Sequence, residues 1–257
     1  MYNYPQIDAE AIKTAIVDGM VKGYNKCLMY LGETEEGLSS VREYILTVSV
    51  ADTLLEKYLS IYQVRVEQPY QKFSDDAFPP SGFRNNDIFD SITRRQVFIK
   101  PDSRKIDIGL STANGKRSLC GIEIKAINQP YNKIISDIDR LSEALIRKDE
   151  VDESSLQACF VTFLIRSDKR FEYVHLADVR KSEKKSRAKI EKNLLTLRSK
   201  YKDLTYTVEC YDIDTSTVEQ ESKRVFDDGE DFSHRTRAIF GYIIKILPNK
   251  IDKDKKS

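Results

Sequence analysis

The sequence is poor in residues on which several enzyme classes depend. It has two histidines, His175 and His234, among 257 residues, which argues against a His-ligated zinc site and against histidine-dependent nuclease chemistry. The four cysteines lie far apart and form no pair at zinc-ligand or redox spacing, so we expect buried, unpaired thiols. There is no Gly-x-Ser-x-Gly elbow and no phosphate-binding Gly-Lys-Ser/Thr loop, so neither a serine hydrolase nor a nucleotide-driven motor is indicated.

The sequence also lacks an excess of either charge and any long apolar run. Its 42 basic and 41 acidic residues give a net charge of +1, so any attraction to nucleic acid has to be local. No stretch approaches the roughly 20 apolar residues that span a bilayer, and the N-terminus does not have the pattern of a signal peptide. We therefore expect a cytoplasmic protein with no membrane partner. A composition of 40% hydrophobic and 32% charged residues is typical of a globular protein.

Apolar periodicity predicts helices that alternate with strand-like runs, and hence an α/β fold with a mixed sheet. We expect helices over 8–31, 40–62, 132–147 and 182–201. We expect strands over 63–73, 95–100, 104–111, 119–127, 158–166, 171–177 and 204–213. Segment 238–247 is apolar and fits either a helix or a strand. Residues 74–87 are predicted to form a loop, and the charged end, 251–257, to be disordered.

The hairpin over 104–127 carries the most informative charges. In KIDIGL, Asp107 lies between isoleucines, and in GIEIKAI, Glu123 and Lys125 alternate with isoleucines. Strand alternation should place the isoleucines on one face and the charges on the other. Asp107 shares a face with Glu123 only if the two residues pair directly, which centres the hairpin on Gly115. We therefore predict a three-residue connection or a bulge, rather than a two-residue Asn-Gly turn.

Two carboxylates and an ammonium on one face suit a divalent cation. Mg²⁺ takes oxygen ligands, often from only one or two protein carboxylates. We therefore expect Asp107 and Glu123 to hold Mg²⁺, with Mn²⁺ as a substitute, and the carbonyl of Ile124 to add a third ligand. Lys125 is placed to orient or deprotonate a water that the metal activates. The alternative is that these charged side chains are simply exposed to solvent on the outer face of an edge hairpin. A helix that covers the sheet would make such a cluster costly without a metal or partner.

This order of elements resembles the PD-(D/E)xK nuclease superfamily. Asp107 is followed, after the hairpin, by Glu123-Ile124-Lys125, and then by an amphipathic helix that contains Asp-Ile-Asp-Arg-Leu at 137–141. In that family a helix precedes a β-meander bearing Asp and Glu-x-Lys, and a helix and a further strand complete an αβββαβ core. The residue before Asp107 is Ile106 rather than the family's Pro.

The resemblance implies an α/β fold with a restriction-endonuclease-like αβββαβ core over about 40–166. Its mixed central sheet would be flanked by helices. The N-terminal helix 8–31 would precede this core and a C-terminal elaboration, 167–250, would follow it, all within a single nuclease domain over 1–257.

Many members of the family also carry a glutamate on the first core helix. By that likeness Glu43 is a candidate catalytic or metal-binding residue. Ser40-x-x-Glu43 is equally a capping box, in which the glutamate binds only a backbone amide. Glu56 on the same helix and Glu67 on the following strand are the less favoured substitutes.

Basic residues in three places are candidates for contacts with phosphates. Arg94, Arg95, Lys116 and Arg117 are expected nearer the site, and Lys184 and Lys185 lie in a Lys-rich helix that equally fits a solvated face. The resulting expectation is a Mg²⁺-dependent endonuclease that acts on DNA, of the restriction or phage-defence type, as a homodimer if it cuts both strands. The rival expectations are a nuclease-like module that binds nucleic acid or protein without catalysis, and a nuclease acting on RNA or branched DNA.

Overall fold

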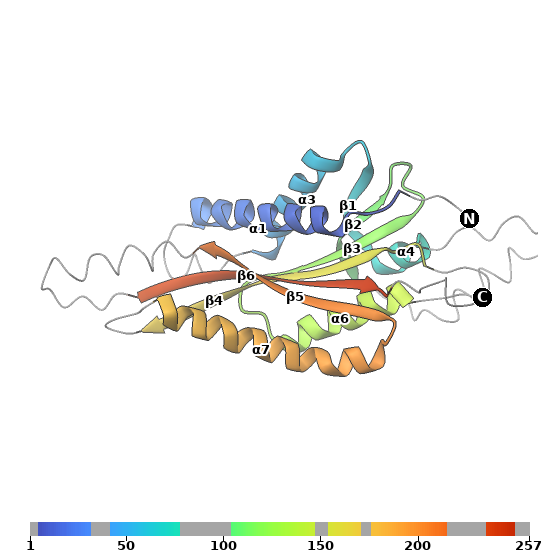
Figure 1. Cartoon of the computed structure of the whole chain (residues 1–257). Helices are drawn as coiled ribbons and strands as arrows, with labels where there is room; N and C mark the ends of the chain where they lie inside the picture. The colour runs from blue at the N-terminus through green and yellow to red at the C-terminus, as the bar shows by residue number, and fades with distance from the viewer. Residues whose placement is uncertain are drawn as a thin grey trace, which may run out of the picture.

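A six-stranded mixed sheet forms the centre of the molecule (Figure 1). The computed structural model describes residues 5–31, 42–77, 104–146, 154–170, 176–214 and 235–249. Its strands, in spatial order, are β1 (Tyr62–Pro69), β2 (Lys105–Thr112), β3 (Ser118–Lys125), β4 (Ala158–Arg170), β6 (Arg235–Pro248) and β5 (Leu204–Asp214). Strand β3 runs parallel to β4, whereas the other neighbouring pairs are antiparallel. The expected α/β class with a mixed sheet is confirmed.

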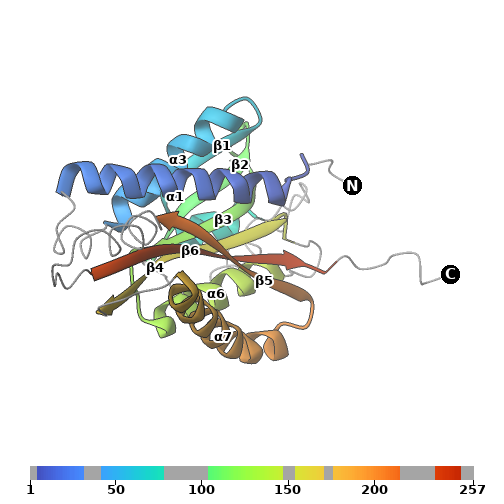
Figure 2. The same ribbon diagram turned by 60° about the vertical axis from the view of Figure 1, so that its left-hand side comes forward.

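Helices cover both faces of this sheet (Figures 1 and 2). Helices α1 (Ala9–Leu31) and α3 (Glu43–Tyr58) lie on one face, and α6 (Tyr131–Ile146) and α7 (Leu176–Lys200) lie on the other. The short helix α4 (Tyr70–Asp75) packs beside β1 and β2. Asp8 caps α1, since its Oδ1 accepts the N–H groups of Glu10 and Ala11 at 3.0 Å.

The sheet separates two hydrophobic clusters. Ile108, Ile122 and Ile124 are fully buried in the cluster that includes α1 and α3, as strand alternation predicts. Ile106, at the start of β2, packs instead in the cluster that includes α6 and α7. Helices α1 and α3 approach closely at Gly19, where an added Cβ would lie 2.5 Å from the Cα of Val50. Glycine at this position therefore permits the two helices to pack.

Several expected boundaries are wrong. The helix expected over 40–62 spans only Glu43–Tyr58, and Tyr62 is already paired with Thr112 in β1. The strand expected over 63–73 ends at Pro69, which lacks the N–H that would extend the ladder, and helix α4 follows. The last two residues of the strand expected over 171–177 instead begin α7.

The undecided segment 238–247 belongs to β6, which pairs with β4 on one side and β5 on the other. Its nearly continuous apolar sequence suits a strand covered on both faces. The expected strand 95–100, residues 78–87 of the expected loop and the tail 251–257 lie outside the described residues. Within the described ranges, no helix has the length and apolar character needed to cross a membrane. The four cysteines are unpaired as expected, three of them buried and Cys210 partly exposed.

Candidate functional site

The register of the β2–β3 hairpin places Asp107 and Glu123 on the same face. Ile108 pairs with Ile122 at this end of the ladder, and continuing the register by one residue sets Asp107 opposite Glu123. The register shifts between Leu110 and Ser111, which is the predicted irregularity. The connection is longer than the three residues expected, since β2 ends at Thr112 and β3 begins at Ser118. Gly115 has a φ of +66° in this connection, a conformation that favours glycine.

The ammonium of Lys125 lies at the centre of the site. Its Nζ is 3.7 Å from Asp107 Oδ2 and 3.4 Å from Glu123 Oε2, and it donates to the carbonyl oxygen of Ile124 over 3.2 Å. The backbone N–H of Ile124 in turn donates to Asp107 Oδ2 over 2.7 Å. The three side chains singled out from the sequence therefore converge on one point, together with the carbonyl of Ile124.

Glu43 reaches the same point from the opposite face of the sheet. It is the first residue of α3, and its Oε1 lies 3.6 Å from the Nζ of Lys125. Its Oε2 accepts the N–H of Ala126 over 3.3 Å. The residue at the N-cap is Arg42, so Glu43 does not occupy the third helical position that a capping box requires. Ser40, the other half of the expected box, lies outside the described residues.

The two substitutes for Glu43 have other partners. Glu56 forms an ion pair with Lys22 of α1 at 2.8 Å. Glu67 forms one with Lys105 at 3.0 Å, and its φ of +55° places it in the left-handed region. Glu43 is therefore the glutamate of the three whose carboxylate lies beside Lys125.

Helix α6 supplies two site residues, Asp137 and Arg140, that were not predicted as such, although both belong to the Asp-Ile-Asp-Arg-Leu stretch at 137–141. Asp137 Oδ2 lies 3.4 Å from the Nζ of Lys125, and Asp137 Oδ1 lies 2.9 Å from Nη2 of Arg140. The same Nη2 donates to Glu123 Oε1. A signal for both residues was present in the sequence. They are charged and lie in the same turns as Ile134, Ile138 and Leu141, on the helix side expected to face the sheet.

Burial makes this cluster electrostatically costly. Glu123 is 1% exposed, and burial, together with the charge of Asp107, raises its pKa to about 8. Burial also raises the pKa of Asp107 and of Glu43. Burial alone would lower the pKa of Lys125, but the surrounding carboxylates outweigh it and raise that pKa. The negative charge at this site is therefore only partly compensated by the protein.

A charge count gives the size of the deficit. Four carboxylates (Glu43, Asp107, Glu123 and Asp137) face two cationic side chains (Lys125 and Arg140), so the fully ionised cluster carries a formal charge of −2. One divalent cation would neutralise it. In the described part of the chain, however, no group of three or more His, Cys, Asp or Glu side chains is placed so that it could hold a metal ion. The donors are of the type that Mg²⁺ takes, and the ammonium of Lys125 occupies their centre.

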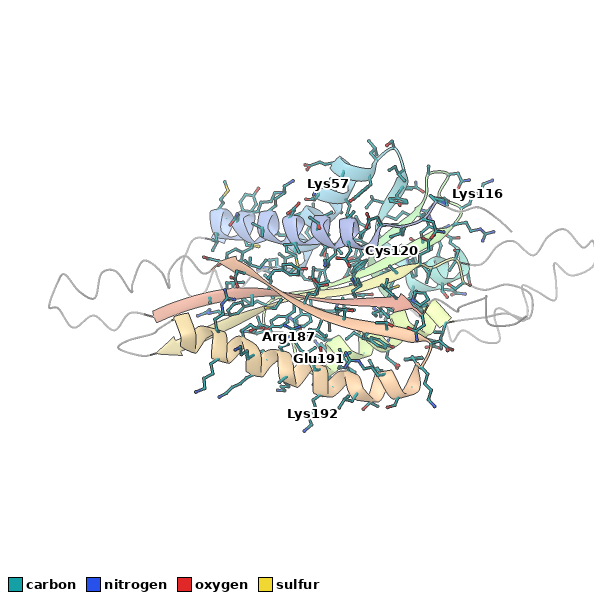
Figure 3. The ribbon with its side chains drawn as sticks, viewed as in Figure 1. Lys57, Lys116, Cys120, Arg187, Glu191 and Lys192 are labelled. Carbon is teal, nitrogen blue, oxygen red and sulfur yellow. The ribbon has the colours of Figure 1, made fainter. Side chains whose placement is uncertain are left out.

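Of the expected phosphate-binding residues that the structure describes, Lys116 and Arg117 do not lie at this cluster. Both lie in the connection between β2 and β3, at the opposite end of β3 from Lys125, where Arg117 is buried. Lys116 is exposed, and its side chain is labelled in Figure 3. Because β3 spans about 23 Å at about 3.3 Å per residue, the expectation that these two residues lie near the site is wrong. Arg94 and Arg95 lie outside the described residues, and Lys184 and Lys185 are exposed on α7.

Comparisons with known proteins identify no relative. No protein-family model, curated protein or solved structure matches this chain. The functional argument therefore rests on the residues and on their geometry.

Proposed function

We propose that this protein is a Mg²⁺-dependent endonuclease that hydrolyses DNA phosphodiester bonds, with a restriction-endonuclease-like core of the PD-(D/E)xK type. The observation that carries the proposal is the convergence of four carboxylates on Lys125, a cluster whose formal charge when fully ionised is −2 and would be neutralised by one divalent cation. Apart from the short helix α4 between β1 and β2, the elements α3, β1, β2, β3, α6 and β4 also follow the helix–strand order of that core. A restriction or phage-defence role is the biological setting that we propose for this activity.

Each residue of the cluster has a role in this proposal. Asp107 and Glu123, with the carbonyl of Ile124, would hold Mg²⁺ or Mn²⁺, and Glu43 would bind the metal or anchor its water. The metal supplies polarisation of the phosphodiester and a lowered pKa for a bound water. Lys125 holds its proton among the carboxylates, because they raise its pKa. Lys125 would therefore remain an ammonium, which orients the attacking water and stabilises developing negative charge. It would not act as the base that accepts a proton from this water.

Helix α7 offers a surface for the phosphate backbone. It contains nine basic and three acidic residues, a formal charge of +6 in a chain whose net charge is +1. Lys181, Lys185, Lys189 and Lys192 are exposed and recur at helical spacing, so they form a stripe on one side of α7. Lys192 points away from the sheet (Figure 3).

The lysine stripe meets the helix that carries part of the site. The Nζ of Lys189 lies 4.3 Å from the ring centroid of Tyr131, the first residue of α6. The segment between Lys125 and Tyr131 joins β3 to α6. A nucleic-acid strand held by Lys185 and Lys189 would thus lie beside the segment that follows Lys125. Affinity for a phosphate backbone depends mainly on such cationic contacts.

The direct test is cleavage of plasmid DNA with Mg²⁺, with and without EDTA. Wild type should cut only with free metal, whereas Asp107→Ala and Lys125→Ala should be inactive while their circular dichroism spectra remain unchanged. Lys105→Ala is the matched control, because Lys105 is an exposed lysine of the neighbouring strand that pairs with Glu67. Cleavage retained by purified Lys125→Ala protein would count against the proposal. Cleavage of both strands would imply two sites, most simply in a homodimer.

One observation favours a second candidate, a nuclease-like module that binds nucleic acid or protein without catalysis. Lys125 occupies the centre of the carboxylates, and the described residues contain no formed metal cage. Calorimetry separates the two candidates, since only the nuclease requires Mg²⁺ or Mn²⁺ binding that depends on Asp107. Competition among duplex DNA, branched DNA and RNA distinguishes a DNA nuclease from one acting on RNA or branched DNA.

A further inference from the structure

We infer that helix α6 completes the cation site, with Asp137 as a fourth oxygen donor and Arg140 as the residue that positions both Asp137 and Glu123. This inference rests on the proposed metal-dependent function and adds residues that neither the hairpin motif nor the helix α3 glutamate supplies. The observation behind it is the way in which the oxygen atoms of two carboxylates are divided between two cationic side chains.

Arg140 and Lys125 divide these oxygens between them. Nη2 of Arg140 contacts Glu123 Oε1 and Asp137 Oδ1. The remaining oxygens, Glu123 Oε2 and Asp137 Oδ2, each lie 3.4 Å from the Nζ of Lys125. Arg140 therefore holds one oxygen of each carboxylate and leaves the other directed at the common centre. Such outer partners orient metal ligands and are commonly as important as the ligands themselves.

The guanidinium of Arg140 is itself fixed by helix α4. The side chain of Arg140 is 6% exposed, and its Cζ lies 5.4 Å from the ring centroid of Tyr70. The hydroxyl of Tyr70 donates to the backbone carbonyl of Arg140 over 3.0 Å. A side chain held at both its backbone and its guanidinium can set the positions of other groups, because its own freedom is restricted.

Glu43 has the same arrangement with a different donor. Its Oε2 is held by the N–H of Ala126, and its Oε1 faces Lys125. Asp107 is anchored by the N–H of Ile124. In Asp107 the oxygen that accepts this N–H, Oδ2, is also the one that faces Lys125. Glu43, Glu123 and Asp137 each have one oxygen held by a donor of the protein and the other directed at the Nζ of Lys125, so Asp137 has the same arrangement as the two glutamates.

The rival explanation is that Asp137 and Arg140 only fasten α6 to the sheet. A buried arginine paired with Glu123 would already serve that purpose with balanced charge, whereas Asp137 adds a negative charge that shares Lys125 with Glu43, Asp107 and Glu123. Asp139, two residues along, shows the purely structural alternative. Its Oδ1 contacts Lys200 and the hydroxyl of Tyr201, each at 2.7 Å, on the side of α6 that faces α7.

Asp139→Asn is therefore the matched control for Asp137→Asn. Each replaces a carboxylate with an amide of equal size on the same helix. Titration of the full-length, EDTA-treated protein with Mn²⁺, followed by calorimetry and electron paramagnetic resonance, should show affinity lowered at least about 10-fold for Asp137→Asn. Asp139→Asn should bind Mn²⁺ as wild type does. Equal affinity in the two variants would overturn the assignment of Asp137.

Arg140→Lys tests positioning separately from charge. Lysine keeps the positive charge but lacks the planar guanidinium that lies over the ring of Tyr70 and brings Nη2 to both carboxylates. We expect about 10- to 100-fold weaker Mn²⁺ binding and an altered resonance spectrum, and wild-type affinity would overturn the positioning role. If Arg140→Lys does not fold, Asp137→Asn decides, because it preserves side-chain shape.

The proposed function and this inference fail in different ways. If neither wild type nor Asp107→Asn binds Mn²⁺, both are overturned. If wild type binds Mn²⁺ through Asp107 and Asp137→Asn binds it equally well, only the inference is overturned.

Discussion

The charge deficit of the site predicts that a divalent cation stabilises the folded protein. The four carboxylates lie 3.4–3.7 Å from a single atom, the Nζ of Lys125, and two of them, Asp107 and Glu123, are at most 8% exposed. The unfolded chain does not keep these groups together, so the metal binds the folded state selectively. At a free metal concentration of 100 times the Kd, such linkage contributes about 2.7 kcal/mol. For a chain of this size that corresponds to an increase in Tm of about 5–11 °C.

The variant that tests this reasoning is Asp107→Asn. In EDTA it should be at least as stable as wild type, because it removes one of four neighbouring negative charges while its amide oxygen can still accept the N–H of Ile124. Saturating Mg²⁺ should then produce little or no stabilisation. Differential scanning calorimetry of EDTA-treated protein, with and without the metal, measures both quantities.

Two results would refute the argument. Wild type could show no increase in Tm at any Mg²⁺ or Mn²⁺ concentration, or Asp107→Asn could show the same increase as wild type. In the first case the carboxylates do not bind a divalent cation, and in the second the cation binds elsewhere. Glu56→Gln is the control. Because Glu56 pairs with Lys22 on α1, the metal should raise the Tm of this variant as much as that of wild type.

Three further predictions concern the surface and the core. Lys185→Glu/Lys189→Glu should weaken binding of duplex DNA in EDTA by at least about 10-fold and flatten its dependence on salt, as fluorescence anisotropy would measure. Gly19→Ala should lower the free energy of unfolding in urea by about 1–3 kcal/mol, because the new Cβ would lie 2.5 Å from the Cα of Val50. Burial raises the pKa of Cys120 well above 9.0, so native protein at pH 8 should resist alkylation of this thiol by iodoacetamide, as mass spectrometry would show. Because the folded state holds this proton more tightly, its contribution to stability is complete below pH 9 and falls as the pH rises above it.

Each of these predictions has a control or a contrary outcome. Lys57→Glu reverses a charge on α3, on the opposite face of the sheet, and should leave DNA affinity unchanged. An equal loss from Lys57→Glu would show that net charge, rather than the lysine stripe, governs binding. Gly23→Ala should cost less than Gly19→Ala, since its nearest contact would be 3.1 Å. Alkylation of Cys120 that is faster than global unfolding would contradict its complete burial.

The sequence was sufficient where the physical cause is local. The apolar spacing over 8–31 predicts a helix, and the structure has one at Ala9–Leu31. Once the pairing of the two strands is specified, the alternation around Asp107 and Glu123 determines which side chains share a face. A common face for Asp107 and Glu123 requires a bulge or a three-residue connection, and the register does shift between Leu110 and Ser111. In these cases the periodicity of the backbone translates residue order directly into geometry.

Tertiary structure decided the features that depend on contacts between distant segments. The apolar sequence of segment 238–247 fits a helix and a strand equally well. It forms a strand because β4 and β5 supply hydrogen-bonding partners on both of its edges. Glu43 lies beside Lys125 because α3 begins close to the end of β3, where the side chain of Glu43 accepts the N–H of Ala126. Asp137 and Arg140 join the cluster because the packing of α6 turns one of its sides toward Glu123. Charge and spacing along the chain specify which groups are available, but only the docking of helices on the sheet determines which of them share one point in space.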